Sequence, residues 1–126
     1  MKFVTTDKAP RPGGHYSQAT VHGGVIYVSG QLPIAPGEGV KDPGSIEDQT
    51  RQALANLLAI VEAGGGNRES VLRVTLYIAH IEDWKAVNEV FADVFGEHRP
   101  ARAVVPVGLL HYGYGIEIDA IAAVPG

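Results

Sequence analysis

Hydrophobic residues along the chain follow two spacings, one typical of strands and one typical of helices. Short runs rich in β-branched and aromatic residues predict strands, and the glycine pair between the first two runs is typical of a hairpin turn. The predicted strands span residues 17–21, 25–30, 71–79, 101–107 and 116–123. The first fifteen residues are rich in proline and glycine, which predicts an irregular lead-in.

Two further segments repeat their apolar residues every three or four positions, as the buried stripe of a helix does. The first begins at Ser45, which forms an approximate capping box with Asp48, and it ends at the glycine run 64–66. The second runs from about residue 82 to residue 95. The predicted stripes are Leu54, Leu57, Leu58 and Val61 in the first helix, and Trp84, Val87, Phe91 and Val94 or Phe95 in the second.

The resulting order, β-β-α-β-α-β-β, predicts an α+β fold in a single domain that covers residues 1–126. No internal repeat or domain boundary interrupts this order. Two amphipathic helices can cover only one face of such a sheet. The uncovered face would expose apolar residues unless a second subunit buried it, so we expect an oligomer.

Composition and charge exclude several classes of function. The formal net charge is −4 and the ten basic residues are scattered, whereas nucleic-acid binders cluster Lys and Arg to contact phosphates. The absence of cysteine removes thiolate nucleophiles and Cys-ligated metals, and none of the five histidines lies in a metal-binding motif. No segment has the character of a signal peptide or a membrane span. We therefore expect a cytoplasmic protein without a metal, a membrane contact or a nucleic-acid partner.

Arg102 is the most informative single residue because it lies near the start of an otherwise apolar predicted strand. Strand alternation places it on the same face as Val104 and Pro106. A buried guanidinium requires a carboxylate partner or an anionic ligand, since an unpaired buried charge is strongly unfavourable. Arginine suits a carboxylate ligand because it donates two parallel hydrogen bonds. A salt bridge at an interface fits this position equally well.

Three other polar side chains are candidates for the same site. If the last two strands pair as a hairpin, Glu117 faces a common cleft with Arg102, where its carboxylate could hold or deprotonate a water. The alternative is a simple Arg102–Glu117 ion pair. Asn88 interrupts the apolar stripe of the second helix, and a buried amide needs hydrogen-bond partners. We interpret it first as a bond between helix and strand, and a contact with a ligand is the alternative. Tyr16 either caps a pocket or packs in the ordinary way.

Five short motifs, in this order along nearly the whole chain, resemble those of the RidA/YjgF imine-deaminase family. They are Gly14-His15-Tyr16-Ser17-Gln18-Ala19, Val28-Ser29-Gly30-Gln31-Leu32-Pro33, Val87-Asn88, Pro100-Ala101-Arg102 and Ile116-Glu117-Ile118-Asp119-Ala120-Ile121-Ala122. The resemblance implies a chorismate-mutase-like fold with two helices on one face of the sheet. It also implies a homotrimer whose sheets form a central barrel, with sites between subunits.

The same resemblance implies an activity and assigns roles to residues. Deaminating members of the family hydrolyse 2-imino acids to 2-keto acids and ammonia without a cofactor. Arg102 matches the arginine that binds the substrate carboxylate, and Glu117 matches the acidic residue associated with the attacking water. Tyr16, together with the backbones of Gly30 and Val104, matches positions near the ligand. We count Asn88 with these residues as a further substrate contact.

The chain departs from the family pattern around the expected pocket. His15 and His111 occupy positions where the family often has proline, and Val104 replaces a common cysteine. Tyr112 and Tyr114 add aromatic bulk near His111. We expect these residues to reshape the pocket and change the preferred imine.

Two other functions remain open. The chain could be a non-catalytic module that senses small carboxylates through Arg102, or, with less support, an endoribonuclease. The absence of a basic stripe disfavours the ribonuclease. Because binding alone requires only the arginine, the presence of both Arg102 and Glu117 favours catalysis.

Overall fold

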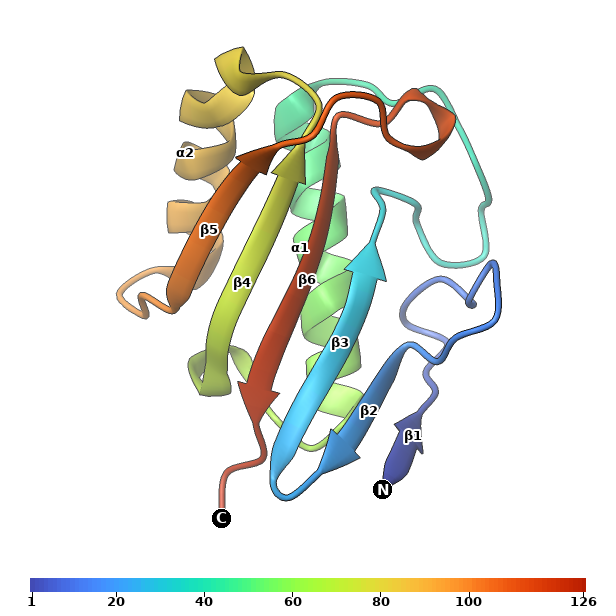
Figure 1. The fold of residues 1–126 in the computed structure, drawn as a ribbon, viewed down its shortest axis with the longest axis vertical. Helices are drawn as coiled ribbons and strands as arrows, with labels where there is room; N and C mark the ends of the chain where they lie inside the picture. Colours follow the sequence, from blue (N-terminus) through green and yellow to red (C-terminus); the bar gives the residue numbers. More distant parts are fainter.

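The computed structural model describes all residues, 1–126, as one six-stranded sheet with two α-helices (Figure 1). The strands are β1 (Lys2–Val4), β2 (Ala19–His22), β3 (Val25–Gln31), β4 (Val71–Ile78), β5 (Ala101–Pro106) and β6 (Ile116–Ala123). The helices are α1 (Ile46–Ala63) and α2 (Trp84–Phe95), and short 3-10 turns are η1 (Arg68–Ser70), η2 (Ile81–Asp83) and η3 (His111–Gly113). The mixed α+β architecture predicted from the hydrophobic pattern is confirmed.

The strands lie in the order β1-β2-β3-β6-β4-β5 across the sheet. All neighbours are antiparallel except β4 and β5, which are parallel. The predicted hairpin between β2 and β3 is confirmed, and Gly23 and Gly24 in its turn have φ of 58° and 77°. Both values lie in the left-handed region that glycine adopts without steric cost.

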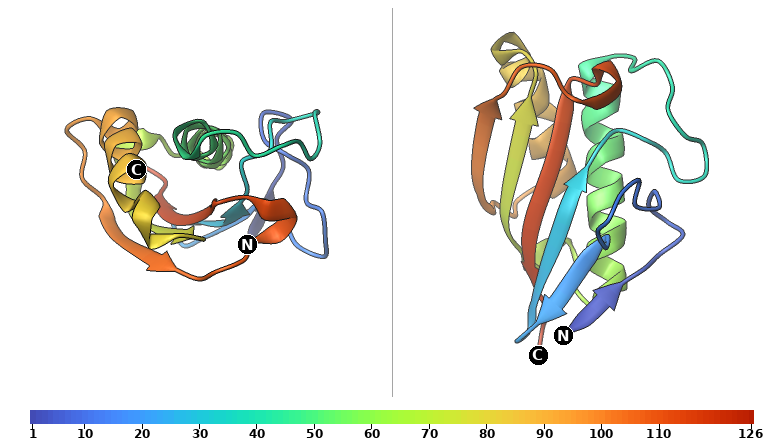
Figure 2. Two further views of the ribbon diagram at one scale, coloured as in Figure 1. Left: turned by 90° about the horizontal axis from the view of Figure 1, so that it is seen from above. Right: turned by 45° about the vertical axis from the view of Figure 1, so that its right-hand side comes forward.

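Both helices cover the same face of the sheet and leave the other face open (Figure 2). The core lies between sheet and helices, where side chains from both layers are fully buried, for example Leu57 and Ile60 of α1, Leu76 of β4 and Ile118 of β6. Alternate residues of β6 point to the two faces, so Glu117 and Asp119 lie on the open one. Burial of one face therefore determines which side chains remain available on the other.

The predicted boundaries of α1 are confirmed in detail. Ser45 is the N-cap, and its side chain accepts a hydrogen bond of 3.1 Å from the backbone N–H of Asp48. At the other end, the backbone N–H of Gly64 donates to carbonyl oxygens of the last turn, and Gly65 has φ of 99°. The glycine run therefore ends a helix, as predicted.

Three details differ from the sequence-based expectations. The lead-in contains β1, which pairs with β2 in the register Lys2↔Val21 to Val4↔Ala19 and adds a strand to the predicted order. Trp84 was expected in the buried stripe of α2 but is 43% exposed, because it is the first residue of the helix and lies near Arg102 at the sheet edge. Finally, β5 and β6 do not form a hairpin, because β4 lies between them.

Neither helix is both long and apolar enough to cross a membrane.

Candidate functional site

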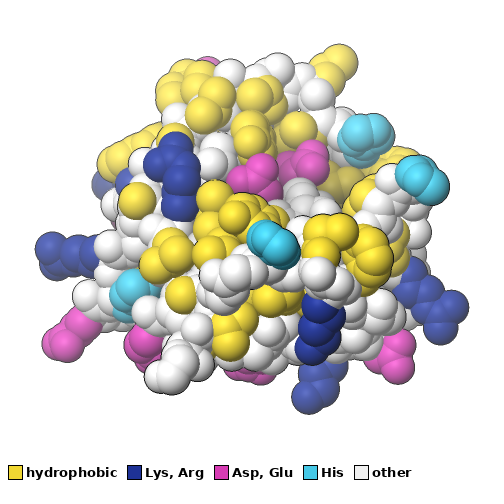
Figure 3. All heavy atoms as spheres, turned by 60° about the horizontal axis from the view of Figure 1, so that its bottom comes forward, with side chains coloured by type: hydrophobic (Ala, Val, Ile, Leu, Met, Phe, Trp, Pro, Cys, Tyr) yellow, Lys and Arg dark blue, Asp and Glu magenta, His cyan; other side chains and the backbone are white.

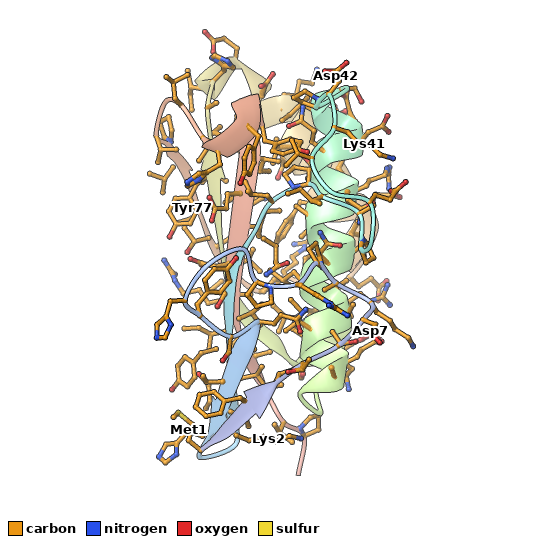
Figure 4. All side chains as sticks on the ribbon, turned by 90° about the vertical axis from the view of Figure 1, so that its right-hand side faces the viewer. Met1, Lys2, Asp7, Lys41, Asp42 and Tyr77 are labelled. Atoms are coloured by element: carbon orange, nitrogen blue, oxygen red, sulfur yellow. The ribbon has the colours of Figure 1, made fainter.

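A cavity of about 920 Å³ lies beside β3 and β6. Its walls come from the lead-in, from the loop of residues 32–44, and from η3. Figure 4, in which the sheet is seen nearly edge-on, shows the lead-in around Asp7 and the loop around Lys41 and Asp42 on the side that faces the viewer. Tyr16, Gly30, His111, Tyr112 and Glu117 line this cavity, and we call them the cavity set.

Gln18 ties the lead-in to the sheet. Its Oε1 accepts a 2.8 Å hydrogen bond from the N–H of Thr6, and its Nε2 donates to the carbonyls of Thr6 and Pro10 at 3.1 and 2.9 Å. Gln18 is 2% exposed, so its amide relies on these backbone partners for its hydrogen bonds. The side chain thereby holds the segment that carries Tyr16, which is a role that the sequence reasoning missed.

Two buried amides of α1 hold the other walls of the cavity. Asn56 donates to the carbonyls of Leu32 and Ile34 at 3.1 and 2.8 Å. Gln49 accepts a 2.7 Å hydrogen bond from the N–H of Gly115, just after η3. The only signal in the sequence is that Asn56 stands among the leucines of the predicted stripe, where a buried amide needs partners.

Gly30 and Glu117 lie against one another on adjacent strands. A Cβ added to Gly30 would overlap Oε2 of Glu117, so the carboxylate occupies the space that a side chain at position 30 would fill. The register of β3 and β6 shifts between Val28 and Gln31, which places Gly30 in an irregular stretch of the ladder. Glu117 forms no ion pair, since the ion pairs of the chain are Lys41–Glu38, Arg51–Asp93 and Arg68–Glu69.

The open face next to Glu117 carries further polar groups among apolar ones. Tyr77 lies opposite Glu117 in the ladder, points away from α1 (Figure 4), and donates a 3.1 Å hydrogen bond to Oδ2 of Asp119. Burial, the hydrogen bond to Asp119 and the negative charges of Asp119 and Glu117 raise the pKa of Tyr77 above its ordinary value of 10.0. Figure 3 views the molecule obliquely from below and shows acidic side chains set among hydrophobic ones.

Arg102 lies on the helix-covered side of the sheet edge. It pairs with Val74, which is fully buried beneath the helices, so both side chains point to that face. Its Nη1 donates a 2.8 Å hydrogen bond to Oδ1 of Asn88. Its Cζ lies 4.9 Å from the ring centre of Phe91 and 6.0 Å from that of Trp84, within the range of cation–π attraction. The predicted bond between helix and strand through Asn88 is confirmed.

The expectation that Arg102 and Glu117 share a cleft or an ion pair is wrong for a single chain. Their strands are separated by β4, and their side chains project from opposite faces of the sheet. Val104 is half-buried, pairs with Leu76 and lies on the same face as Arg102. We call Asn88, Arg102 and Val104 the arginine set, and it is separate from the cavity set within one chain.

The residues that depart from the family pattern fall in different places. His111 and Tyr112 line the cavity, whereas His15 is exposed and does not. Tyr114 is 2% exposed, and its hydroxyl oxygen accepts a 3.2 Å hydrogen bond from the N–H of Lys41. Tyr16 is 52% exposed, and its hydroxyl accepts a 3.2 Å hydrogen bond from the N–H of Gly13. The structure has no group of three or more His, Cys, Asp or Glu side chains placed to hold a metal ion.

Comparison of the sequence with known proteins identifies the family of this chain. A family model described as Endoribonuclease L-PSP matches residues 6–124. A RutC family protein of Pyrococcus horikoshii is 45% identical over 96% of this chain and 96% of its own. The 2-iminobutanoate/2-iminopropanoate deaminase of Rattus norvegicus is 41% identical over 96% of this chain and 88% of its own.

Solved structures agree with the sequence comparison. The crystal structure of E. coli TdcF with bound serine is similar with a TM-score of 0.93 and 35% sequence identity, over 98% of both chains. The protein thus has the fold and the sequence of the RidA/YjgF class. The chain belongs to this family, whose model carries the endoribonuclease L-PSP description. The resemblance noted from the five motifs is confirmed.

Proposed function

We propose that the protein hydrolyses 2-imino acids to 2-keto acids and ammonia. The observation that carries the proposal is the unpaired Glu117 carboxylate, which lies in an open cavity against a glycine that leaves room for it. Relatives about 40% identical are named 2-iminobutanoate/2-iminopropanoate deaminases. A free carboxylate can hold the water that attacks the C=N carbon of such imino acids. An imine carbon is already electrophilic, so the reaction requires orientation and a positioned water more than an activated nucleophile.

Arg102 supplies the orientation in this proposal. Its one hydrogen bond within the chain leaves further guanidinium N–H groups free to donate to a substrate carboxylate. Asn88 fixes the guanidinium from one side, and the ring of Phe91 supports its face. A guanidinium held in this way loses little conformational freedom when it binds an anion.

Glu117 holds the attacking water and accepts its proton. The water oxygen bonds to the imine carbon while the π electrons of the C=N bond move to nitrogen, which takes up the proton that Glu117 accepted from the water. Glu117 then accepts the hydroxyl proton of the resulting tetrahedral aminoalcohol as the C=O bond forms, and it returns this proton to the nitrogen, which leaves with the C–N electron pair as ammonia. Every proton and electron pair is conserved, and no cofactor takes part in any step.

Because the two sets lie apart in one chain, we propose that the site is completed between copies of the chain. The cavity set of one copy would face the arginine set of the next, and the open sheet faces would meet in the interior of the assembly. The expected number of copies is three, in a closed ring of the kind that head-to-tail interfaces form. The apolar residues on the open face and at the sheet edge, among them Tyr27 and Val105, support such burial.

The test is to generate 2-iminopropanoate in situ from alanine with an amino-acid oxidase and to measure the release of pyruvate. We expect the wild type to accelerate release above spontaneous hydrolysis and Arg102→Ala to reduce the acceleration roughly ten- to a hundredfold, as for the loss of a charge-assisted hydrogen-bonding partner. Arg51→Ala is the matched control, because Arg51 forms only an exposed ion pair with Asp93. Absence of acceleration by the wild type would refute the proposal.

A second candidate is a sensor that binds small carboxylates without turning them over. The relative TdcF was crystallised with bound serine, a small molecule that carries a carboxylate. In that case the wild type would bind 2-keto acids through Arg102 and leave the rate of imine hydrolysis unchanged. The ribonuclease activity in the family description has less support, because the chain has a net charge of −4 and no basic stripe.

A further inference from the structure

The turn η3 has an unusual backbone conformation at the cavity wall. Tyr112 has φ of 61° and ψ of 18°, and it is the one non-glycine residue of the chain with a positive φ. A bulky side chain in this region is disfavoured relative to glycine, and such positions gather at functional sites. Both Tyr112 and His111 line the cavity that contains Glu117.

Tyr112 is the middle ring of three, which we call the aromatic wall (His111, Tyr112 and Tyr114). The ring centres of His111 and Tyr112 are 5.9 Å apart, and those of Tyr112 and Tyr114 are 6.3 Å apart in an edge-to-face arrangement. Tyr114 is the buried anchor, and its hydroxyl is held by the N–H of Lys41. Tyr112 contacts Tyr114 at one edge and is 61% exposed, so most of its ring is accessible to a ligand.

The cavity is large for the substrates named among the relatives. Its volume of about 920 Å³ is near the upper end of the range found for pockets that hold drug-sized ligands. In the single chain, a three-carbon imino acid would fill only a small part of it. Leu32, Ile34 and Val40 add apolar surface to the same cavity, which suits an apolar substituent.

We infer that the aromatic wall selects 2-imino acids that carry an aromatic side chain, with Tyr112 as the specificity-determining residue. The inference rests on the proposed deamination. The substrate carboxylate binds Arg102 of a neighbouring copy, the C=N carbon lies near Glu117, and the substrate ring stacks on or meets the edge of Tyr112. Offset and edge-to-face contacts of this kind favour an aromatic substituent over a methyl group.

The test compares two imines generated in situ, one from phenylalanine and one from alanine. We expect the wild type to accelerate hydrolysis of the aromatic imine more than that of the small one. Tyr112→Gly should lower the ratio of the two rates roughly three- to tenfold, the effect of losing one aromatic contact. Tyr112→Phe should preserve the ratio. Leu109→Ala is the control, because Leu109 follows β5 in the same connection, is 97% exposed and does not line this cavity.

Tyr112→Gly also separates specificity from folding. Glycine adopts the observed φ without strain, so the variant should be at least as heat-stable as the wild type while its preference changes. A rate ratio that Tyr112→Gly leaves unchanged would overturn the inference.

Binding of the 2-keto acid products provides a readout that does not depend on turnover. Calorimetry should show tighter binding of phenylpyruvate than of pyruvate to the wild type, and Tyr112→Gly should reduce this difference. Equal binding of the two products would overturn the inference even if both imines are turned over. Failure of the wild type to accelerate either imine would instead refute the deaminase function on which the inference rests.

Discussion

Among single residues, Gly30 matters to the candidate site because it has no side chain. Gly30 leaves the volume that the Glu117 carboxylate fills, and the irregular register of β3 and β6 keeps the two in contact. Arg102 depends on its neighbours in a similar way, because Asn88 and Phe91 determine where its guanidinium lies. Small changes beside the two charged groups should therefore affect activity before they affect folding.

Gly30→Ala tests this dependence directly. The added methyl group must displace the end of the Glu117 side chain, which is flexible, so the free energy of unfolding should change by less than about 1 kcal/mol. Acceleration of imine hydrolysis should fall roughly tenfold or more, because the carboxylate that we propose holds the water has moved. Steady-state rates and thermal melts measure the two effects.

Gly13→Ala is the matched control for this change. Gly13 lines the same cavity, but a Cβ there would meet no atom within 4 Å, and its φ is not positive. It should therefore keep the wild-type rate. Equal losses of activity in Gly13→Ala and Gly30→Ala would argue against a specific role for the contact between Gly30 and Glu117.

At the scale of elements, the cavity is made of loops that three buried amides attach to the regular structure. Gln18 holds the lead-in, Asn56 holds the loop of residues 32–44, and Gln49 holds the residue that follows η3. Each side chain satisfies backbone groups that would otherwise lack partners. The shape of the cavity therefore depends on polar groups inside the fold.

Gln18→Ala should loosen the lead-in. The N–H of Thr6 and the carbonyl of Pro10 lose their partners, which should lower the free energy of unfolding by about 2 kcal/mol. Amide hydrogen exchange should rise over residues 5–18, and the deamination rate should fall because the segment carries Tyr16. His15→Ala, an exposed neighbour that makes no side-chain hydrogen bond, should change neither. Unaltered exchange in Gln18→Ala would contradict the anchoring role.

The pair of Tyr77 and Asp119 links β4 to β6 and gives the fold a dependence on alkaline pH. Because the folded state raises the pKa of Tyr77 above 10.0, it holds the phenolic proton more tightly than the unfolded chain does. This contribution is fully present below pH 10 and is lost as the pH rises through the folded-state pKa. The free energy of unfolding should therefore fall with pH above about 10.

Tyr77→Phe should flatten this decline and, by removing one hydrogen bond, lower stability near pH 7 by about 1 kcal/mol. Denaturant unfolding between pH 7 and pH 11 measures both effects. Tyr27→Phe is the matched control, because Tyr27 lies on the same open face as Tyr77 and its hydroxyl makes no hydrogen bond within the chain. An identical slope in wild type and Tyr77→Phe would show that the alkaline decline has another source.

The features that sequence reasoning predicted are those with a local cause. Ser45 and the glycine run determine the ends of α1 through neighbours only a few residues away, and both ends were predicted. Alternation also placed Arg102 and Val104 on the same face of their strand, as the structure has them. A bond of Asn88 between helix and strand was also predicted, because a buried amide in a helical stripe needs a partner, and the structure identifies that partner as Arg102.

The features that were missed depend on distant segments. The three-residue strand β1 pairs through its backbone, and a run so short shows no hydrophobic alternation. In the sheet, β4 lies between β5 and β6. The hydrophobic pattern within a strand does not show which strands become its neighbours. The hydrogen-bond partners of Gln18, Asn56 and Gln49 are backbone groups in loops, and no pattern in the sequence identifies these partners.

At the scale of the whole molecule, the distribution of the site is the main result. One chain carries the arginine set at the β5 edge, under the helices, and the cavity set on the other side of the sheet beyond β4. A reaction that uses both sets requires at least two copies of the chain. The open face with its apolar residues gives the copies a surface on which to associate.

This claim can be tested by mixing two inactive variants. Arg102→Ala lacks the proposed carboxylate-binding group and Glu117→Gln lacks the proposed proton acceptor, so each alone should accelerate imine hydrolysis very little. If every site combines Arg102 of one copy with Glu117 of the next, random assembly of an equimolar mixture produces intact sites at about one quarter of the positions. The variants should be unfolded and refolded together so that their subunits exchange.

The decisive measurement is the rate of 2-keto acid release by this refolded mixture. We predict about one quarter of the wild-type activity, well above the sum of the two variants refolded separately. A mixture no more active than that sum, in a protein shown to have exchanged subunits, would contradict a site shared between copies.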